Sequence, residues 1–128
     1  IHVLVVEDDK ITRELLESVV RGAGFQVAQA EHGRDALESM KVQVPDLILL
    51  DLMMPVMNGF EFMKALRGDP KSREIPVIVL TSKDVTDEER RILEGGGSKI
   101  MSKGSYGMQD LLEEIRRVHP FRPGRDRV

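Results

Sequence analysis

Hydrophobic residues in this chain gather in short runs separated by stretches with helical spacing. Three runs, at residues 2–6, 46–50 and 76–81, are almost continuously apolar, which indicates strands buried on both faces. Residues 25–30 alternate between apolar and polar and predict a more exposed strand. Residues 98–103 predict a short fifth strand.

Between these runs, apolar residues recur at three- and four-residue spacing, which is typical of amphipathic helices. Asn58 with Glu61, and Thr86 with Glu89, have the spacing of capping boxes, and Asp9 is a candidate cap of the first helix. The predicted helices cover residues 10–24, 33–41 and 108–118, a segment from Asn58 to about Asp69, and a segment from Thr86 that Gly95–Gly97 stops.

Apolar stripes on three of these helices are candidates for the surfaces that face a core. They consist of Ile11, Leu15, Val19 and Ala23 on the first helix, Ala36, Leu37 and Met40 on the second, and Met108, Leu111, Leu112 and Ile115 on the last.

Strands that alternate with helices at short spacing predict βαβ units, in which the strands are parallel and helices cover both faces of the sheet. We therefore predict an α/β fold with a doubly wound five-stranded parallel sheet of strand order 2-1-3-4-5. In such a sheet, ligands bind outside the carboxyl ends of the strands, where the strand order reverses.

Composition narrows the class of protein. With 128 residues, 41% of them hydrophobic and 32% charged, the chain fits one globular domain. A net charge of -3 with mixed signs does not indicate nucleic-acid binding. There is no cysteine, and His2, His32 and His119 lack the spacing of metal ligands, so no transition-metal site is expected. No apolar run is long enough for a membrane span, and no signal peptide is visible.

Polar residues end four of the five predicted strands. Glu7 and Asp8 follow the first, Asp51 follows the third, Thr81 ends the fourth, and Lys103 ends the fifth. These strands are neighbours in the predicted order, so their side chains should share one crevice. Taken singly, each residue has an ordinary explanation as a turn former, cap or surface group. The prediction rests on their joint placement.

This set of groups suits phosphoryl chemistry. Clustered carboxylates repel one another unless a cation lies among them, and oxygen ligands suit Mg²⁺. A carboxylate such as Asp51 can act as a nucleophile and form an aspartyl phosphate. Thr81 and Lys103 can then bind the remaining phosphoryl oxygens.

The segments "VLVVEDDKITR", "DLILLDLMMPVMNGFEF", "IPVIVLTSKD" and "KIMSKGSY" resemble the receiver domain of two-component response regulators. The resemblance implies a flavodoxin-like three-layer sandwich that accepts a phosphoryl group but is not itself an enzyme acting on other substrates. It implies that Asp51 is the phosphoacceptor, and that Asp8, Asp51 and the Met53 carbonyl hold Mg²⁺ directly while Glu7 holds it through a water molecule. Thr81 and Lys103 would contact the phosphoryl group.

Two positions depart from the family pattern. Gly104 follows the lysine where the family usually has proline, and Ile100 stands where it often has an aromatic switch residue. The "SKGSY" ending is similar to receivers of hybrid histidine kinases.

Two alternatives remain: a hydrolase of the haloacid dehalogenase type, whose second aspartate would stand where Met53 does, and a receiver-like module that is never phosphorylated.

The resemblance also implies partners and surroundings. We expect a histidine kinase or a histidine phosphotransfer domain as the donor, no nucleic-acid or direct membrane contact, a cytoplasmic location, and fusion to other signalling domains. Ile11 and Leu15 could belong to the docking face for the donor or to the core. We expect a receiver domain at residues 1–119, a tail or linker at 120–128, and a longer parent protein, because the chain begins at Ile1 without Met.

Overall fold

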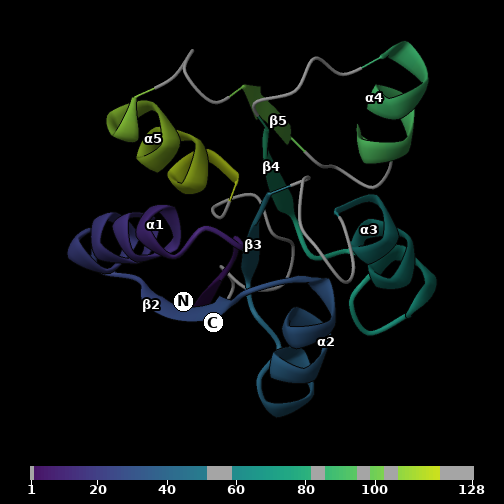
Figure 1. Ribbon diagram of the computed structural model, residues 1–128, viewed down its shortest axis with the longest axis horizontal. Helices are drawn as coiled ribbons and strands as arrows, with labels where there is room; N and C mark the ends of the chain where they lie inside the picture. The colour runs from purple at the N-terminus through teal and green to yellow at the C-terminus, as the bar shows by residue number, and fades with distance from the viewer. Residues whose placement is uncertain (1, 52–58, 82–85, 95–98, 103–106, 119–128) are drawn as a thin grey trace.

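The computed structural model describes residues 2–51, 59–81, 86–94, 99–102 and 107–118. Strands and helices alternate along the whole described chain (Figure 1), as the sequence predicts. The strands are β1 (His2–Val6), β2 (Gln26–Ala30), β3 (Leu47–Asp51), β4 (Val77–Thr81) and β5 (Lys99–Ser102). The helices are α1 (Lys10–Gly22), α2 (Gly33–Val42), α3 (Gly59–Gly68), α4 (Asp87–Glu94) and α5 (Met108–Val118).

All strand pairs are parallel, and the sheet has the order β2-β1-β3-β4-β5, which confirms the predicted topology. Helices α1 and α5 cover one face, whereas α2, α3 and α4 cover the other (Figure 1). The fold is therefore a doubly wound three-layer sandwich. Within the described ranges, no helix combines the length and the apolar character needed to cross a membrane.

Alternate residues of each central strand enter two separate cores. In β3, Ile48 and Leu50 belong to the core beneath α2 and α3, while Leu47 and Leu49 belong to the core beneath α1 and α5. Strands β1 and β4 divide in the same way, which explains why all three strands read as continuous apolar runs. The edge strand β2 is more exposed, as its alternating sequence predicts.

Of the two explanations left open for Ile11 and Leu15 on α1, a place in the core is wrong, because both side chains are exposed. The side chains that α1 buries are Arg13, Leu16 and Val20, whereas Ile11 is 78% exposed and Leu15 is 49% exposed. The helix carries two neighbouring apolar stripes, and the sheet covers only the one that contains Leu16 and Val20, which are four residues apart. The predicted faces of α2 and α5 are confirmed for the side chains that the structure describes: Ala36, Leu37, Met40, Leu111, Leu112 and Ile115.

Helix ends follow the predicted signals where the structure describes them. Asp9 caps α1, and its carboxylate accepts a hydrogen bond from the Thr12 N–H at 2.9 Å. Gly24 closes the same helix with a φ of 101°, a conformation that suits glycine. Helix α4 starts after Thr86, as predicted, while Asn58, the Glu89 side chain and Gly95–Gly97 lie outside the described residues.

Two sets of contacts hold the edge of the sheet where the strands begin. Asp46 connects the starts of β1 and β3, because its carboxylate accepts from the His2 N–H and its own N–H donates to the His2 carbonyl, both at 2.8 Å. Arg67 at the end of α3 donates to the carbonyls of Arg73 and Ile75 at 2.6 and 3.0 Å. Burial lowers the pKa of the Arg67 guanidinium, because the charged form loses hydration.

Candidate functional site

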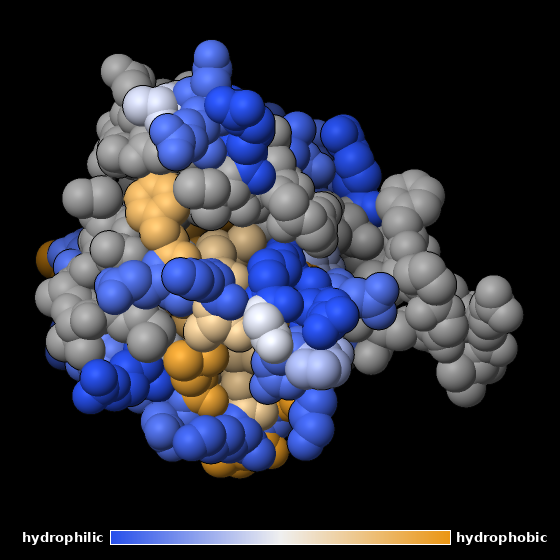
Figure 2. Space-filling model, turned by 90° about the vertical axis from the view of Figure 1, so that its right-hand side faces the viewer, coloured by the Kyte–Doolittle hydropathy of each residue, from blue (hydrophilic) through white to orange (hydrophobic). Residues whose placement is uncertain are grey.

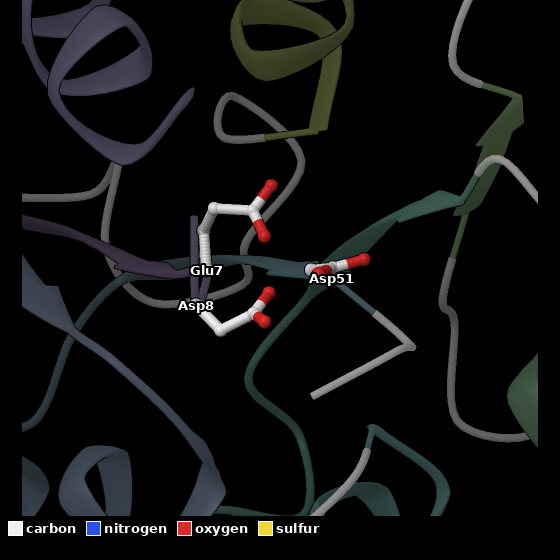
Figure 3. A group of neighbouring side chains, drawn as sticks. All are labelled: Glu7, Asp8 and Asp51. Atoms are coloured by element: carbon white, nitrogen blue, oxygen red, sulfur yellow. The ribbon is translucent and has the colours of Figure 1, made fainter. Parts of the chain in front are cut away.

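The acidic residues predicted from the strand ends lie at the carboxyl edge of the sheet, where the strand order reverses. Strands β1 and β3 are parallel neighbours, and Val6 pairs with Leu50. Glu7 and Asp8 follow Val6 directly, and Asp51 follows Leu50, so the two strands deliver the three carboxylates to the same place. Figure 3 shows Glu7 and Asp8 reaching from the end of β1 toward Asp51.

The three carboxylates are close enough to share one ion. Each offers an oxygen, and these oxygens all lie within 4.8 Å of one another. Glu7 is 2% exposed and Asp51 is 6% exposed, while Asp8 faces solvent. The Glu7 carboxylate also lies 3.5 Å from the Asp9 N–H, at the limit of a hydrogen bond. Two of the three charges are therefore largely removed from water.

A positive charge among the three carboxylates would stabilise this arrangement. Carboxylates at such separations repel one another, and burial of two of them adds a desolvation penalty. An all-oxygen set of carboxylates, without histidine or cysteine, suits a hard divalent cation that also retains water and binds phosphate oxygens. The residues present thus fit Mg²⁺ in their donor chemistry and in their convergence.

Strands β4 and β5 continue the same edge. Leu80 pairs with Asp51, so the backbone of Thr81 stands one position beyond Asp51 on the neighbouring strand. Thr81 in turn pairs with Ser102, the residue before Lys103. The side chain of Thr81 and the whole of Met53 and Lys103 lie outside the described residues. The structure therefore brings together Glu7, Asp8 and Asp51, and places the backbone of Thr81 nearby.

One residue beside the site was missed by the sequence analysis. Arg13 is buried beneath the turn that carries the acidic pair, and its Nη1 donates to the carbonyl of Glu7 at 2.9 Å. The signal was its position, three residues before Leu16 and seven before Val20, on the stripe of α1 that faces the sheet. A charged residue in a core stripe requires a polar partner.

The chain belongs to the response regulator receiver domain family, whose family model matches residues 3–116. It is therefore a receiver domain of two-component signal transduction, a signalling module and not an enzyme with a separate substrate. The family places a histidine kinase upstream of it. The alternative of a haloacid dehalogenase-type hydrolase is wrong.

Individual relatives agree with this assignment. The chain is 34% identical over 101 residues to the polar-differentiation response regulator DivK of Brucella anthropi, covering 79% of this chain and 82% of that protein. It is 35% identical over 117 residues to the phosphate regulon transcriptional regulatory protein PhoB of Escherichia coli, covering 91% of this chain and 51% of PhoB. A gliding motility regulatory protein of Myxococcus xanthus is 33% identical, but the chain spans only 15% of its length.

Solved structures with the same fold include two receivers. The signal receiver domain of a histidine kinase from Syntrophus aciditrophicus matches with a TM-score of 0.84 and 28% identity, covering 99% of this chain and 93% of that one. The chemotaxis protein CheY4 of Vibrio cholerae matches with a TM-score of 0.82 and 31% identity, covering 91% and 97%. The chain thus spans nearly all of two known receivers but only part of several longer relatives.

Proposed function

We propose that this receiver accepts a phosphoryl group on Asp51 from a phosphohistidine of a histidine kinase or a histidine phosphotransfer domain, with Mg²⁺ bound. The observation that carries the proposal is the convergence of Glu7, Asp8 and Asp51 at the carboxyl ends of two adjacent strands. A structural role alone does not account for three carboxylates so close together with two of them buried.

Asp8 and Asp51 would hold the metal directly with their carboxylates, Met53 with its backbone carbonyl, and Glu7 through a water molecule. When bound, Mg²⁺ supplies positive charge that offsets the repulsion among the carboxylates and the charge of the phosphoryl oxygens. Glu7 is fixed by burial, and Asp8 is accessible from solvent, so the site combines a rigid ligand with an open side through which a phosphodonor can enter.

Asp51 would act as the nucleophile. Its carboxylate oxygen attacks phosphorus, a new P–O bond forms, and the P–N bond to the donor imidazole breaks, leaving the histidine to take up a proton. Thr81 would hydrogen-bond one phosphoryl oxygen and Lys103 would pair with another, which stabilises the charge as the group is transferred. Later attack of water on the aspartyl phosphate releases inorganic phosphate and restores Asp51.

The test is phosphorylation by a small phosphodonor such as acetyl phosphate, which needs no partner protein. The expected result is one phosphoryl group per chain in Mg²⁺ and none with excess chelator. Borohydride reduction converts an aspartyl phosphate to homoserine, and peptide mass spectrometry should locate it at Asp51. Asp69→Asn serves as the control, because Asp69 follows α3 at the opposite edge of the sheet. Uptake elsewhere, or none in Mg²⁺, would contradict the proposal and favour the module that is never phosphorylated.

The docking face for the donor is proposed to include the start of α1, where Lys10, Ile11, Glu14 and Leu15 are all exposed. Helix α1 begins two residues after Asp8, so these side chains border the site. An apolar side chain that is 78% exposed, like Ile11, suits contact with a partner. The loop Gly104–Tyr106, outside the described residues, would complete this face.

Ile11→Ser is expected to slow phosphotransfer from a histidine phosphotransfer domain by about tenfold, because it removes an apolar contact at the centre of the face. Uptake from acetyl phosphate should not change. Val42→Ser is the matched control, since Val42 is 89% exposed at the end of α2, far from the strand ends that carry the acids. Equal rates for the two variants with the protein donor would argue against this face.

The remaining assignments are also proposals. The family match covers residues 3–116, which supports a receiver domain at residues 1–119 followed by a tail or linker at 120–128. Relatives much longer than this chain support fusion to other signalling domains. The receiver of a histidine kinase among the similar structures supports, in particular, a hybrid kinase. A cytoplasmic location, without nucleic-acid or direct membrane contact, fits such a module.

A further inference from the structure

Arg13 is a buried arginine on α1 with three partners at the ends of two neighbouring strands. It is 7% exposed. Its Nη1 donates to the Glu7 carbonyl at 2.9 Å, and its Nε donates to Oε1 of Gln29 on β2 at 3.0 Å. Its Nη2 lies 3.8 Å from the carboxylate of Glu31, the residue after β2. The guanidinium thus joins α1, the end of β1 and the end of β2.

The bond from Arg13 acts on the peptide that links the two acidic residues. The carbonyl of Glu7 belongs to the peptide unit between Glu7 and Asp8, so holding this carbonyl orients the peptide plane that joins the two residues and restricts where their side chains leave the backbone. The other backbone polar group of Glu7 is also held, because its N–H donates to the Ala30 carbonyl at 3.1 Å. Both sides of the Glu7 backbone are therefore anchored, one by β2 and one by Arg13.

Arg13 also brings positive charge to the site without occupying its ligands. Its interactions among the described residues are with the Glu7 carbonyl, Gln29 and Glu31, and not with the carboxylates of Asp8 or Asp51. A buried cation near clustered anions lowers their repulsion.

We propose that Arg13 is a positioning residue for the metal site, and that it holds Glu7 and Asp8 in the arrangement that binds Mg²⁺. The proposal rests on the proposed function, because it takes the acidic cluster to be a Mg²⁺ site. The planar guanidinium suits this role, since it donates two hydrogen bonds and pairs with Glu31 at the same time, whereas the lysine ammonium is a single point at the end of a flexible chain.

The test measures metal affinity and not phosphorylation. Mn²⁺ binding to the full chain is followed by the electron paramagnetic resonance signal of free Mn²⁺, and Mg²⁺ is then titrated in as the competitor. Arg13→Gln is expected to weaken Mg²⁺ binding about tenfold, the size of effect typical for a residue that orients a metal ligand. Arg13→Lys should retain part of the affinity but bind more weakly than the parent.

Arg21→Gln is the matched control. Arg21 lies on the same helix, pairs with Glu17 at 2.8 Å and donates to a β2 carbonyl, that of Val27, at 3.3 Å, but it is remote from the acidic cluster. Its partner Glu17 has a lowered pKa, first because of the hydrogen bond from Arg21. Loss of Arg21 should change stability slightly and leave the Mg²⁺ dissociation constant unchanged.

Affinities are compared at a temperature where circular dichroism shows each variant fully folded, so that lost stability alone does not alter them. If Arg13→Gln does not fold, Arg13→Lys decides. Parent-like Mg²⁺ affinity in the folded Arg13 variants would overturn the positioning role while leaving the proposed function intact. Failure of the parent itself to bind Mg²⁺ or Mn²⁺ would instead overturn the metal part of the proposed function, and this inference with it.

Discussion

Replacing Asp51 with Asn is expected to abolish phosphoryl uptake and, without Mg²⁺, to raise the melting temperature. Asn is nearly the same size as Asp but is neutral and a poor nucleophile, so the acceptor is lost while the packing is retained. The variant removes one of three carboxylates whose oxygens lie within 4.8 Å. Two carboxylate charges at this separation repel each other by roughly 3 kcal/mol at an effective dielectric constant of about 20, and solvent screening at Asp8 reduces this repulsion. We expect the free energy of unfolding to increase by about 1–2 kcal/mol, which corresponds to a rise of several degrees in the melting temperature.

Mg²⁺ should reverse the order of the two melting temperatures, so that the parent melts above the Asp51→Asn variant. At a metal concentration about 100 times the dissociation constant, binding stabilises the folded parent by about 2.7 kcal/mol, whereas the Asn variant has lost a charged ligand and should gain less. Thermal melts followed by circular dichroism, with chelator and with saturating Mg²⁺, measure both effects. Asp69→Asn should follow the parent in both conditions. A parent melting curve that does not move in saturating Mg²⁺ would contradict the metal site.

Replacing Phe62 with Ala is expected to lower the free energy of unfolding by about 3–5 kcal/mol, a large fraction of the stability of a domain of this size. Phe62 on α3 is 0% exposed and belongs to the core between the sheet and the helices α2 and α3. Removing the ring leaves a cavity that the surrounding strands cannot fill, since their backbones are fixed by pairing on both sides.

Phe60, two residues earlier on the same helix, is the matched control. It is only partly buried and lines a surface cavity of about 690 Å³ together with Met63 and Lys64. On the side of the molecule where α2, α3 and α4 lie, hydrophobic side chains form a narrow band between hydrophilic ones (Figure 2). Phe60→Ala should therefore cost only about 1 kcal/mol. Urea unfolding measures both changes, and similar losses in the two variants would contradict this division of α3 into a core side and a surface side.

The fold was predictable because its signals are strong and agree with one another. Each buried strand is a short apolar run, and the alternation with helices leaves few topologies open. The acidic cluster was predictable for the same reason: in a parallel sheet, Glu7, Asp8 and Asp51 must come to one edge once β1 and β3 are neighbours. The strand order therefore brings residues that are far apart in the sequence together at one site.

Orientation of side chains on a helix was less predictable. Helix α1 has apolar residues on two adjacent stripes, and periodicity alone does not say which of them meets the sheet. The deciding residue is Arg13, whose burial requires the Glu7 carbonyl and Gln29 as partners, and these partners come together only in the tertiary fold. Similarly, His32 caps α2 by accepting from the Asp35 N–H at 3.1 Å, a role for which histidine is not among the usual residues.

The place of β3 in the sheet limits how the proposed phosphorylation of Asp51 could be transmitted. β3 is the middle strand, paired with β1 on one side and β4 on the other, and Leu47–Leu50 are buried on both faces. Its backbone cannot shift without breaking two ladders of hydrogen bonds. On the proposed function, β3 would therefore act as a fixed frame, and a displacement that follows phosphorylation would involve the side chains around Asp51 and not the backbone of this strand. Signalling through a phosphorylated Asp51 would then be a rearrangement of groups around a central strand that keeps its place in the sheet.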